Sequence, residues 1–169
     1  SKEGKYLFML AGERNVDLLF EAAVAGGIPL IRVLRESLLG EPVEKIMGIV
    51  NGTTNYILSQ MEENGMPYSE ALLEAQKLGY AESDPTADVS GQDAASKAAI
   101  IAMVAFGADV SLDDVLFEGI QNISSADVAF ASRAGCAIKL LAMISKHGHE
   151  LEAVSYTHLT LPRKTPCRS

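Results

Sequence analysis

The candidate chemistry of this chain is concentrated in residues 79–97, whose sequence is GYAESDPTADVSGQDAASK. The ionisable side chains of this stretch are Glu82, Asp84, Asp88, Asp93 and Lys97. Asp93 and Lys97 are four residues apart, so on a helix they lie on one face and can form an ion pair. A solvated pair contributes only about 0.2–0.5 kcal/mol to stability and performs no chemistry. A pair shielded from water provides a lysine that can transfer protons.

The residues that follow favour the shielded pair. From Ala94 to Ala108 (AASKAAIIAMVAFGA), Lys97 is the only charged residue. A helix that is apolar nearly all round is a buried helix. A lone lysine on such a helix is expected at the wall of a cavity, with its charge met by carboxylates. Ser90 is the expected N-cap, which would place Asp93 at the third helical position of a capping box, facing the positive end of the helix.

A second candidate region lies near the start of the chain. Residues 4–15 are typical of the end of a helix, and residues 17–24 (DLLFEAAV) of a buried strand in which Glu21 is the odd charge. The sequence Gly26-Gly27-Ile28-Pro29 then indicates a tight turn into a helix that ends near residue 39. This turn is either a plain strand-to-helix connection or a place where a ligand approaches bare backbone. In the second case, strand-end carbonyl groups and Glu21 could hold a hard cation.

A polar cluster, residues 51–55 (NGTTN), follows a predicted strand at residues 45–50. One interpretation is that Thr53 or Thr54 is the N-cap of a helix. The other is a polar patch at the carboxyl end of a strand, where α/β proteins usually bind ligands. Gly79 is expected to end the next helix as its C-cap, which is compatible with a ligand lying against the same backbone.

The C-terminal part adds strands to this pattern. Strands are expected at residues 115–120, 137–145 and 151–154, with a hairpin turn at residues 147–149 and a capped helix at residues 124–134. The predicted fold is therefore α/β (α+β), with a mixed sheet covered by helices. Residues 155–169 change character: they contain two prolines and three basic residues, and they are expected to be disordered or non-native.

Composition limits the classes of function. A chain of 169 residues with 48% hydrophobic and 21% charged residues is typical of one soluble globular domain. The net charge of −8 argues against nucleic acid or an anionic membrane as the main partner. The two cysteines and three histidines have no metal-binding spacing. No signal core is present, and the longest uncharged run, residues 98–108, is too short to span a bilayer, so cytoplasmic residence is expected.

Several ordered motifs are similar to those of bacterial homoserine dehydrogenases. They are FEAAVAGGIPLIR, GIVNGTTNYIL, KLGYAESDPTADVSGQDAASK and FEGIQNIS, and the similarity runs from about residue 4 to residue 154. The resemblance implies reduction of L-aspartate 4-semialdehyde to L-homoserine with NADPH or NADH, on the route to threonine and methionine. It also implies an N-terminal Rossmann domain and an α/β catalytic domain that forms a homodimer.

The resemblance assigns roles to individual residues. It implies that Lys97 is the acid–base lysine and that Asp93 is the substrate-binding aspartate beside it. Glu82 and Asp88 would bind the small-molecule substrate as well. Three positions would contact the NADP or NAD cofactor: Gly79, Gly27 and Pro29. Four would bind a monovalent cation, Na⁺ or K⁺, largely through carbonyl oxygens: Glu21, Val24, Gly26 and Ile28.

The resemblance also divides the chain. Residues 1–25 would be the C-terminal remnant, only the tail end, of a Rossmann nucleotide-binding domain. Residues 26–154 would be an incomplete catalytic and dimerisation domain, and residues 155–169 a tail foreign to the family. The family's glycine-rich strands, an upstream substrate lysine and a closing strand are missing from this sequence, so it is expected to be a truncated fragment that is inactive alone.

Two other functions fit the same residues. Lys97 could be the nucleophile of a Schiff-base lyase or aldolase, which would form a covalent adduct with a carbonyl substrate. Alternatively, the chain could be a non-catalytic dimerisation module whose acidic loop is only a solvated surface. Nicotinamide-dependent turnover favours the reductase, and borohydride trapping of an adduct favours the lyase.

Overall fold

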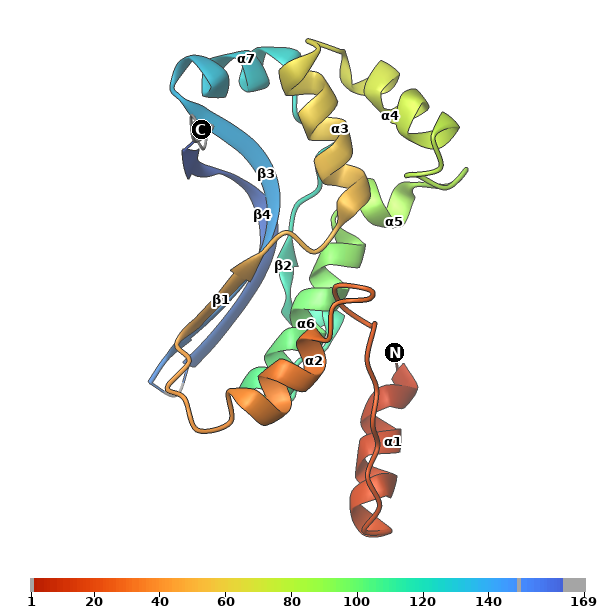
Figure 1. The fold of residues 1–169 in the computed structure, drawn as a ribbon, viewed down its shortest axis with the longest axis vertical. Coiled ribbons are helices and arrows are strands. Elements are labelled where there is room, and N and C mark those ends of the chain that lie inside the picture. The colour runs from red at the N-terminus through yellow and green to blue at the C-terminus, as the bar shows by residue number, and fades with distance from the viewer. Residues whose placement is uncertain (1, 149, 163–169) are drawn as a thin grey trace, which may run out of the picture.

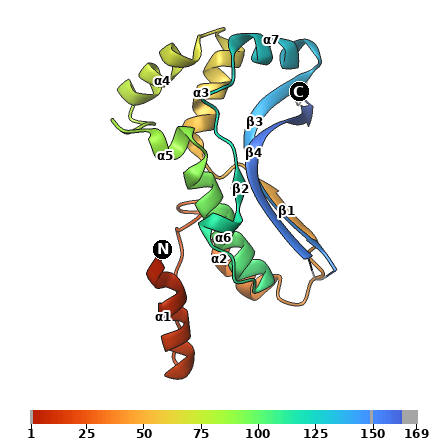
Figure 2. The ribbon, with the colours of Figure 1, turned by 180° about the vertical axis from the view of Figure 1, so that it is seen from behind.

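A mixed sheet forms one layer of the molecule, and helices cover one of its faces (Figures 1 and 2). The computed structural model describes residues 2–148 and 150–162. Within them the strand order is β1-β3-β4-β2; β3 is antiparallel to β1 and β4, and β2 is parallel to β4. The strands are β1 (Lys45–Gly48), β2 (Leu116–Phe117), β3 (Cys136–His147) and β4 (Glu150–Pro162). This arrangement confirms the predicted mixed sheet with a helical cover.

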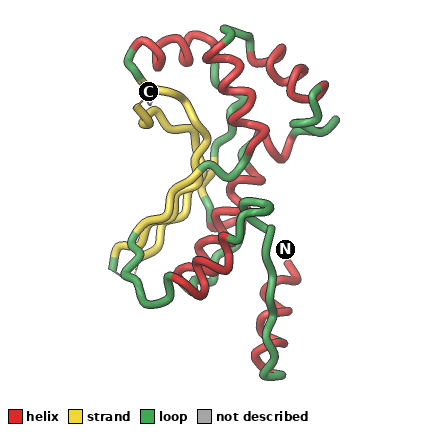
Figure 3. The backbone as a smooth tube through the Cα atoms, viewed as in Figure 1, coloured by secondary structure: helices red, strands yellow, loops and turns green. Residues whose placement is uncertain are grey.

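The helices occupy most of the chain before β3 (Figure 3). They are α1 (Lys2–Glu13), α2 (Leu30–Arg32), the π-helical turn η1 (Val33–Ser37), α3 (Gly52–Glu63), α4 (Tyr68–Lys77), α5 (Thr86–Val89), α6 (Gln92–Phe106), the 3₁₀ turn η2 (Leu112–Asp114) and α7 (Ser125–Arg133). Helices α3, α6 and α7 pack directly against β3, whereas α4 packs on α3. The helix predicted from Pro29 to about residue 39 is thus a short α-helix continued by a π-helical turn.

The two faces of the long β3–β4 hairpin differ because side chains alternate along a strand. Leu140, Ala142 and Ile144 face the helices and belong to the buried core. The alternate residues Leu141 and Met143 lie on the other face and form a separate apolar cluster with Val154 and Tyr156 of β4. The described helices do not cover this second face, which is the open side of the sheet in Figures 1 and 2.

Two core clusters meet beside the start of α6. The first joins α3, α4 and α7 to the sheet, and the second joins α2, η1 and most of α6 to it. Neighbouring residues of α6 belong to different clusters: Ala94 lies in the first and Ala95 in the second. Val50, just after β1, packs against both. A polar group at this seam is therefore held by two independently packed parts of the molecule.

Helix α6 is the buried helix that its sequence predicts. Six of its side chains, all apolar, are buried: Ala94, Ala95, Ala98, Ala99, Ile101 and Ala102. Its predicted N-cap is wrong. The capping position is Gly91, in the left-handed conformation with φ 85°, and Ser90 ends the preceding helix α5. The N-cap predicted for α3 is also wrong, because Asn51, rather than Thr53 or Thr54, accepts the free N–H group there.

The strand predicted at residues 17–24 is absent. Ala22 and Ala25 have φ near 64°, which no extended strand allows, and the segment is mostly exposed. A strand also needs a neighbour for its backbone hydrogen bonds, and none of the described strands runs beside this segment. Helix α1 is present as predicted but stands apart from the sheet and its helices (Figure 1).

Two boundaries near the C-terminus differ from prediction. The strand expected at residues 115–120 is only Leu116–Phe117, because the next residues turn across the start of α6. Strand β4 continues through Pro162, so residues 155–162 are ordered sheet and not the expected disordered tail. Pairing with β3 supplies the order that the irregular sequence pattern does not reveal. The rest of the expected tail lies outside the described residues.

Candidate functional site

Lys97 and Asp93 form the predicted pair at the start of α6. The Lys97 Nζ atom lies 2.6 Å from Asp93 Oδ2, and it also donates a hydrogen bond of 2.9 Å to the backbone carbonyl of Val50. The lysine side chain is only 24% exposed and the aspartate side chain 30%. The pair is therefore partly shielded from water but still reachable by a ligand, which is the arrangement that an acid–base group requires.

Asn51 joins a second carboxylate to this pair. Its side-chain Nδ2 donates hydrogen bonds of 2.7 Å to Asp88 Oδ1 and 2.8 Å to Asp93 Oδ2. Its Oδ1 accepts from the backbone N–H and the hydroxyl of Thr54, at 2.9 and 2.8 Å, which caps α3. Asn51 is 4% exposed. The site is thus a cluster of Lys97, Asp93, Asp88 and Asn51, where β1 ends and α3 and α6 begin.

A close backbone crossing fixes the turn that carries Asp88 and Asp93. The N–H of Ile120 donates to the carbonyl of Val89 at 2.9 Å, which brings the segment after β2 across the α5–α6 turn. There is no room for a side chain at this crossing. A Cβ at Gly119 would overlap the Val89 carbonyl oxygen, and one at Gly91 would lie 3.1 Å from the carbonyl oxygen of Glu118. Both glycines are therefore required by the packing that holds the two aspartates.

The remaining acidic residues of the stretch have different environments. Asp84 accepts hydrogen bonds from the hydroxyl and backbone N–H of Thr86, at 2.6 and 3.1 Å, and these bonds hold its pKa below the ordinary value. Asp84 therefore binds the first residue of helix α5 and is not part of the cluster. Glu82 is exposed, and its backbone carbonyl, not its carboxylate, accepts from the amide of Gln76 at 3.1 Å. The structure does not join the Glu82 carboxylate to Lys97.

The turn after α4 lies beside the start of α3. Helix α4 ends one residue earlier than predicted: Leu78 is its C-cap, and Gly79, with φ 79°, follows it. The next residue, Tyr80, is tied to α3 twice: its carbonyl accepts from the Thr53 hydroxyl at 2.6 Å, and its ring stacks on Tyr56 at 4.5 Å between centroids. No described atom lies within 4 Å of a Cβ built on Gly79. The backbone of Gly79 is therefore open to a ligand, close to the start of α3 that Asn51 caps.

The residues predicted to bind a cation lie in an irregular turn against α6. Val24 is fully buried in the same core cluster as Ala95 and Ala98, whereas Gly26, Gly27 and Ile28 are exposed. The Glu21 carboxylate accepts hydrogen bonds from the backbone N–H groups of Arg32 at 2.9 Å and Ile31 at 3.1 Å, in the first turn of α2. Its carboxylate therefore caps a helix. The described residues contain no group of three His, Cys, Asp or Glu side chains that could hold a metal, so a cation here would rely on carbonyl oxygens.

Replacing Glu21 with glutamine is expected to destabilise the fold at neutral pH. Burial raises the pKa of the Glu21 carboxyl, but the N–H groups of Arg32, Ile31 and Ala22 lower it, and the net result is a pKa below the ordinary 4.5. The charge therefore stabilises the fold above that pH, and this stabilisation is lost as the pH falls through the folded-state pKa. Thermal unfolding of both proteins at several pH values should show a gap at pH 7 that closes in acid. A gap of constant size would contradict the role of the charge.

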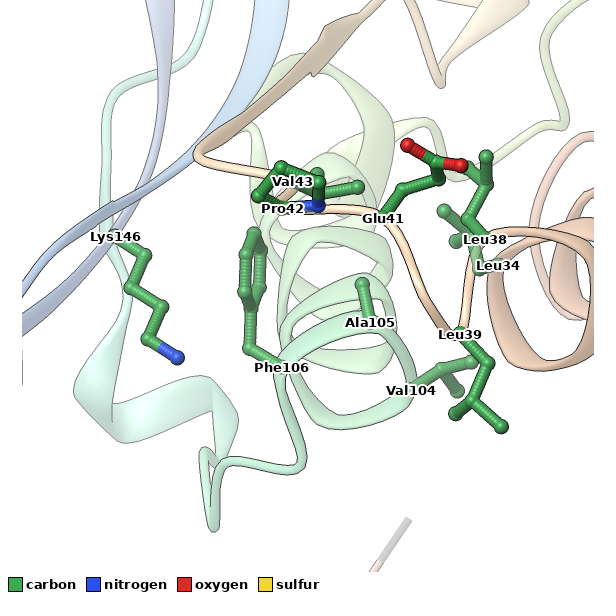
Figure 4. A pocket seen from close by; sticks show the side chains of 10 residues that line it. All are labelled: Leu34, Leu38, Leu39, Glu41, Pro42, Val43, Val104, Ala105, Phe106 and Lys146. Carbon is green, nitrogen blue, oxygen red and sulfur yellow. The ribbon is translucent and has the colours of Figure 1, made fainter.

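A hollow on the surface lies at the opposite end of α6 from this cluster (Figure 4). Most of the residues that line it are of apolar type, and they come from η1, the loop before β1, and the last turn of α6, including Leu38, Val104 and Phe106. Glu41 and Lys146 are the charged residues at its rim. None of the cluster residues Lys97, Asp93, Asp88 and Asn51 lines this hollow, so it is separate from the candidate site.

Comparison with known proteins gives one consistent family. The homoserine dehydrogenase family profile matches residues 29–165. The homoserine dehydrogenase of Corynebacterium glutamicum is 60% identical over 132 residues, which cover 78% of this chain and 30% of that protein. The solved homoserine dehydrogenase of Thiobacillus denitrificans aligns with a TM-score of 0.88 at 42% identity, covering 92% of this chain and 36% of that one. A hyperthermophilic archaeal homoserine dehydrogenase mutant in complex with NADPH aligns with a TM-score of 0.76 at 32% identity, covering 96% and 46%.

Fold and site together define an α/β domain with a partly shielded lysine–carboxylate cluster at the seam of its two core clusters. The chain belongs to the homoserine dehydrogenase family. It spans about a third of the length of the C. glutamicum and T. denitrificans proteins. The family match continues past Val154 to residue 165, so it does not end where the foreign tail was expected to begin.

Proposed function

We propose that this chain supplies the catalytic centre of an NAD(P)-dependent homoserine dehydrogenase, which reduces L-aspartate 4-semialdehyde to L-homoserine for threonine and methionine synthesis. The observation that carries the proposal is the Lys97 ammonium. Two of its three N–H donors are used within the described residues, by Asp93 and the Val50 carbonyl. The third can be directed at a substrate oxygen. Family membership over most of the chain supports the same activity.

The proton chemistry follows from this geometry. Reduction of an aldehyde adds a hydride to carbon and a proton to oxygen. When bound, the nicotinamide supplies the hydride. Lys97 stabilises the negative charge that develops on the carbonyl oxygen and then donates a proton to it, which yields the alcohol. Asp93 holds the amine in position through its 2.6 Å contact, so Lys97 need not reorganise during the reaction.

The acidic residues fit an amino-acid substrate. Asp88 and Asp93 present two carboxylates beside one lysine, which leaves net negative charge for the α-ammonium group that both substrate and product carry. Glu82, which is exposed and lies three residues after Gly79, would close on that group once the substrate is bound. We therefore assign substrate binding to Glu82, Asp88 and Asp93.

The cofactor would lie between the two glycine turns. Gly79 has an open backbone next to the α3 end, and the exposed turn with Gly27 and Pro29 packs through Val24 against α6. The NADPH complex of the archaeal relative supports NADP or NAD as the cofactor. The carbonyl oxygens of the same turn, at Glu21, Val24, Gly26 and Ile28, would hold the monovalent cation Na⁺ or K⁺. The turn has positive φ values at Ala22, Ala25 and Gly26, which fold its backbone back on itself. This shape suits coordination of a cation by carbonyl oxygens.

The division of the chain is also part of the proposal. We assign residues 1–25 to the nucleotide-binding domain, because α1 stands apart from the sheet with exposed apolar side chains such as Tyr6, Leu7 and Met9. We assign residues 26–154 to the catalytic domain, together with the strand that continues to residue 162. No helix among the described residues has the length and apolar character to cross a bilayer. The cytoplasm is the proposed compartment because the substrates belong to amino-acid synthesis.

Nicotinamide absorbance tests this function in a polypeptide that carries this chain together with a nucleotide-binding domain, called here the complete enzyme. We expect L-homoserine to drive reduction of NADP⁺ or NAD⁺, and L-aspartate 4-semialdehyde to drive the reverse reaction. Absence of both signals under conditions where the T. denitrificans enzyme turns over would contradict the proposed function.

The open face of the sheet supports a homodimer. It carries the apolar cluster of Leu141, Met143, Val154 and Tyr156, and Met47, the cross-strand neighbour of Met143, is 49% exposed. Leu141, Met143 and Val154 are already buried within this chain, so a second copy would mainly cover the exposed Met47 beside them with the same face.

Replacing Met47 with glutamate is expected to weaken the dimer at least about tenfold, since a charge is costly in an apolar interface. The mass of the complete enzyme measured by light scattering over a dilution series checks this. Leu73→Glu is the control, because Leu73 is similarly exposed but lies on α4, away from the sheet. Equal dissociation of the two variants would rule out this face as the interface.

A further inference from the structure

Asn51 makes more contacts in the cluster than an N-cap requires. A capping side chain needs one acceptor, and the Asn51 Oδ1 supplies it to Thr54. Its Nδ2 has no part in capping and donates to two carboxylates, Asp88 and Asp93. Both amide hydrogens are used, so the hydrogen-bonding capacity of this nearly buried side chain is fully committed.

We propose that Asn51 is the positioning residue of the site, which fixes the Asp93 carboxylate so that Asp93 holds Lys97 in its reactive position. This inference rests on the proposed function. The shared atom is Asp93 Oδ2, which accepts from Asn51 at 2.8 Å and from Lys97 at 2.6 Å. Two donors on one oxygen define the orientation of the carboxylate, and with it the direction of the lysine amine.

The position of the lysine amine is set from one place in the chain. The Val50 carbonyl accepts a hydrogen bond of 2.9 Å from Lys97, and the adjacent Asn51 donates one to Asp93. Both residues lie within three positions of the end of β1 at Gly48, and Val50 packs against both core clusters. The segment 50–51 therefore transmits the rigidity of the sheet and of α3 to the acid–base pair. Lys97 itself is anchored on a different element, α6.

The amide also keeps two like charges together. Asp88 and Asp93 both lie within hydrogen-bonding distance of the same nitrogen, so their carboxylates are close neighbours in a partly dehydrated place. Like charges at such a distance repel each other unless donors lie between them. Asn51 supplies those donors without adding charge, which a lysine or arginine in its place could not do. Without the amide, we expect the two carboxylates to move apart and Asp93 to loosen its hold on Lys97.

Two substitutions separate positioning from helix capping. Asn51→Asp keeps the size and the cap acceptor but replaces the two N–H groups with a third negative charge, and Asn51→Ser keeps a cap acceptor without the amide. Asparagine, aspartate and serine are about equally good N-caps. A capping role alone therefore predicts three enzymes with similar kcat.

The positioning role predicts a different order of kcat in the complete enzyme: asparagine first, serine lower by about 10- to 100-fold, and aspartate lowest. The loss should appear in kcat because the displaced amine acts on the reacting oxygen, and the KM for homoserine should rise as well because Asp88 and Asp93 also bind the α-ammonium group. Ser124→Ala is the matched control. It removes the side-chain cap of α7, outside the cluster, so it should lower the unfolding temperature and leave kcat unchanged. An Asn51→Asp enzyme with the parental kcat would overturn the proposal.

A readout independent of turnover separates this inference from the proposed function. Acetic anhydride acetylates lysine amines, and mass spectrometry gives the rate for Lys97 relative to exposed lysines of the same protein. We expect the Lys97 rate to rise severalfold in Asn51→Ser, because the amine is less firmly held. An unchanged rate in the folded variant refutes positioning by Asn51 even if the parent is an active dehydrogenase. A raised rate in Asn51→Ser, together with a parent that shows no dehydrogenase activity, upholds positioning and refutes the function.

Discussion

Replacing Lys97 with alanine is expected to lower the kcat of the complete enzyme by about 10²- to 10⁴-fold while homoserine still binds. The substitution removes the amine that donates the proton, but it leaves the carboxylates that bind the α-ammonium group. The helix itself should tolerate alanine, because most of the buried residues of α6 are alanines already. Steady-state kinetics and homoserine binding by calorimetry measure the two quantities separately.

Two further variants make this result specific to the Lys97 amine. Lys97→Arg keeps the positive charge but presents a planar fork instead of a compact ammonium, so we expect it not to restore kcat. Lys45→Ala removes an exposed lysine at the start of β1 and should leave kcat unchanged. Borohydride treatment in the presence of aspartate semialdehyde should trap no adduct on Lys97. A trapped adduct, or normal turnover without the lysine, would contradict the assigned role.

Replacing Gly119 with alanine is expected to have the largest effect on the architecture of the site. The new Cβ would overlap the Val89 carbonyl oxygen and lie 2.7 Å from the Cα of Ser90. These are backbone atoms and cannot rotate away, so the chain segments must separate. Overpacking of this kind costs about 1–3 kcal/mol, and here it also displaces the turn between Asp88 and Asp93. We therefore expect a lower free energy of unfolding together with a lower kcat.

The effect of Gly119→Ala can be measured by denaturant unfolding and by kinetics on the same preparation. Gly40→Ala is the matched control, because a Cβ at Gly40 meets nothing within 4 Å and its φ is not in the left-handed region. That variant should differ little from the parent in both measurements. A Gly119→Ala enzyme with parental stability and kcat would show that the crossing does not fix the aspartates.

The central pair could be predicted from sequence because the signal is local. Asp93 and Lys97 are one helical turn apart, and a single charged residue on a buried apolar helix must lie where a carboxylate can neutralise it. The same reasoning placed α6 and the capping box at Ser124, which the structure confirms, and it placed the end of α4 to within one residue, at Leu78 instead of Gly79. Each of these depends on residues within a few positions of one another.

The rest of the site depends on contacts that no local pattern contains. Asn51 is 37 residues from Asp88 and 42 from Asp93, and a cap at that position looks the same with or without a bridging amide. The crossing at Gly119 is likewise set by tertiary packing against Val89. A signal for Asn51 did exist, since polar residues that follow a strand often meet a ligand, but it did not single out one member of the cluster.

The predicted strand at residues 17–24 shows that a clear local pattern can also predict the wrong structure. Its apolar run satisfies the strand pattern, but a strand forms only beside a partner with free backbone groups. In the described residues the segment is an irregular turn whose Glu21 caps α2. The sequence pattern therefore predicted the wrong conformation for the segment that contains Glu21 and Val24, two of the proposed cation contacts.

A crystal structure of the complete enzyme with L-homoserine bound tests the central claim most directly. The account predicts that the homoserine hydroxyl oxygen lies about 2.6–3.2 Å from the Lys97 Nζ atom, with the α-ammonium group against the carboxylates and the Asp93 and Val50 contacts of the lysine intact. A homoserine bound with its hydroxyl directed away from Lys97, or a lysine swung out into solvent in that complex, would contradict it.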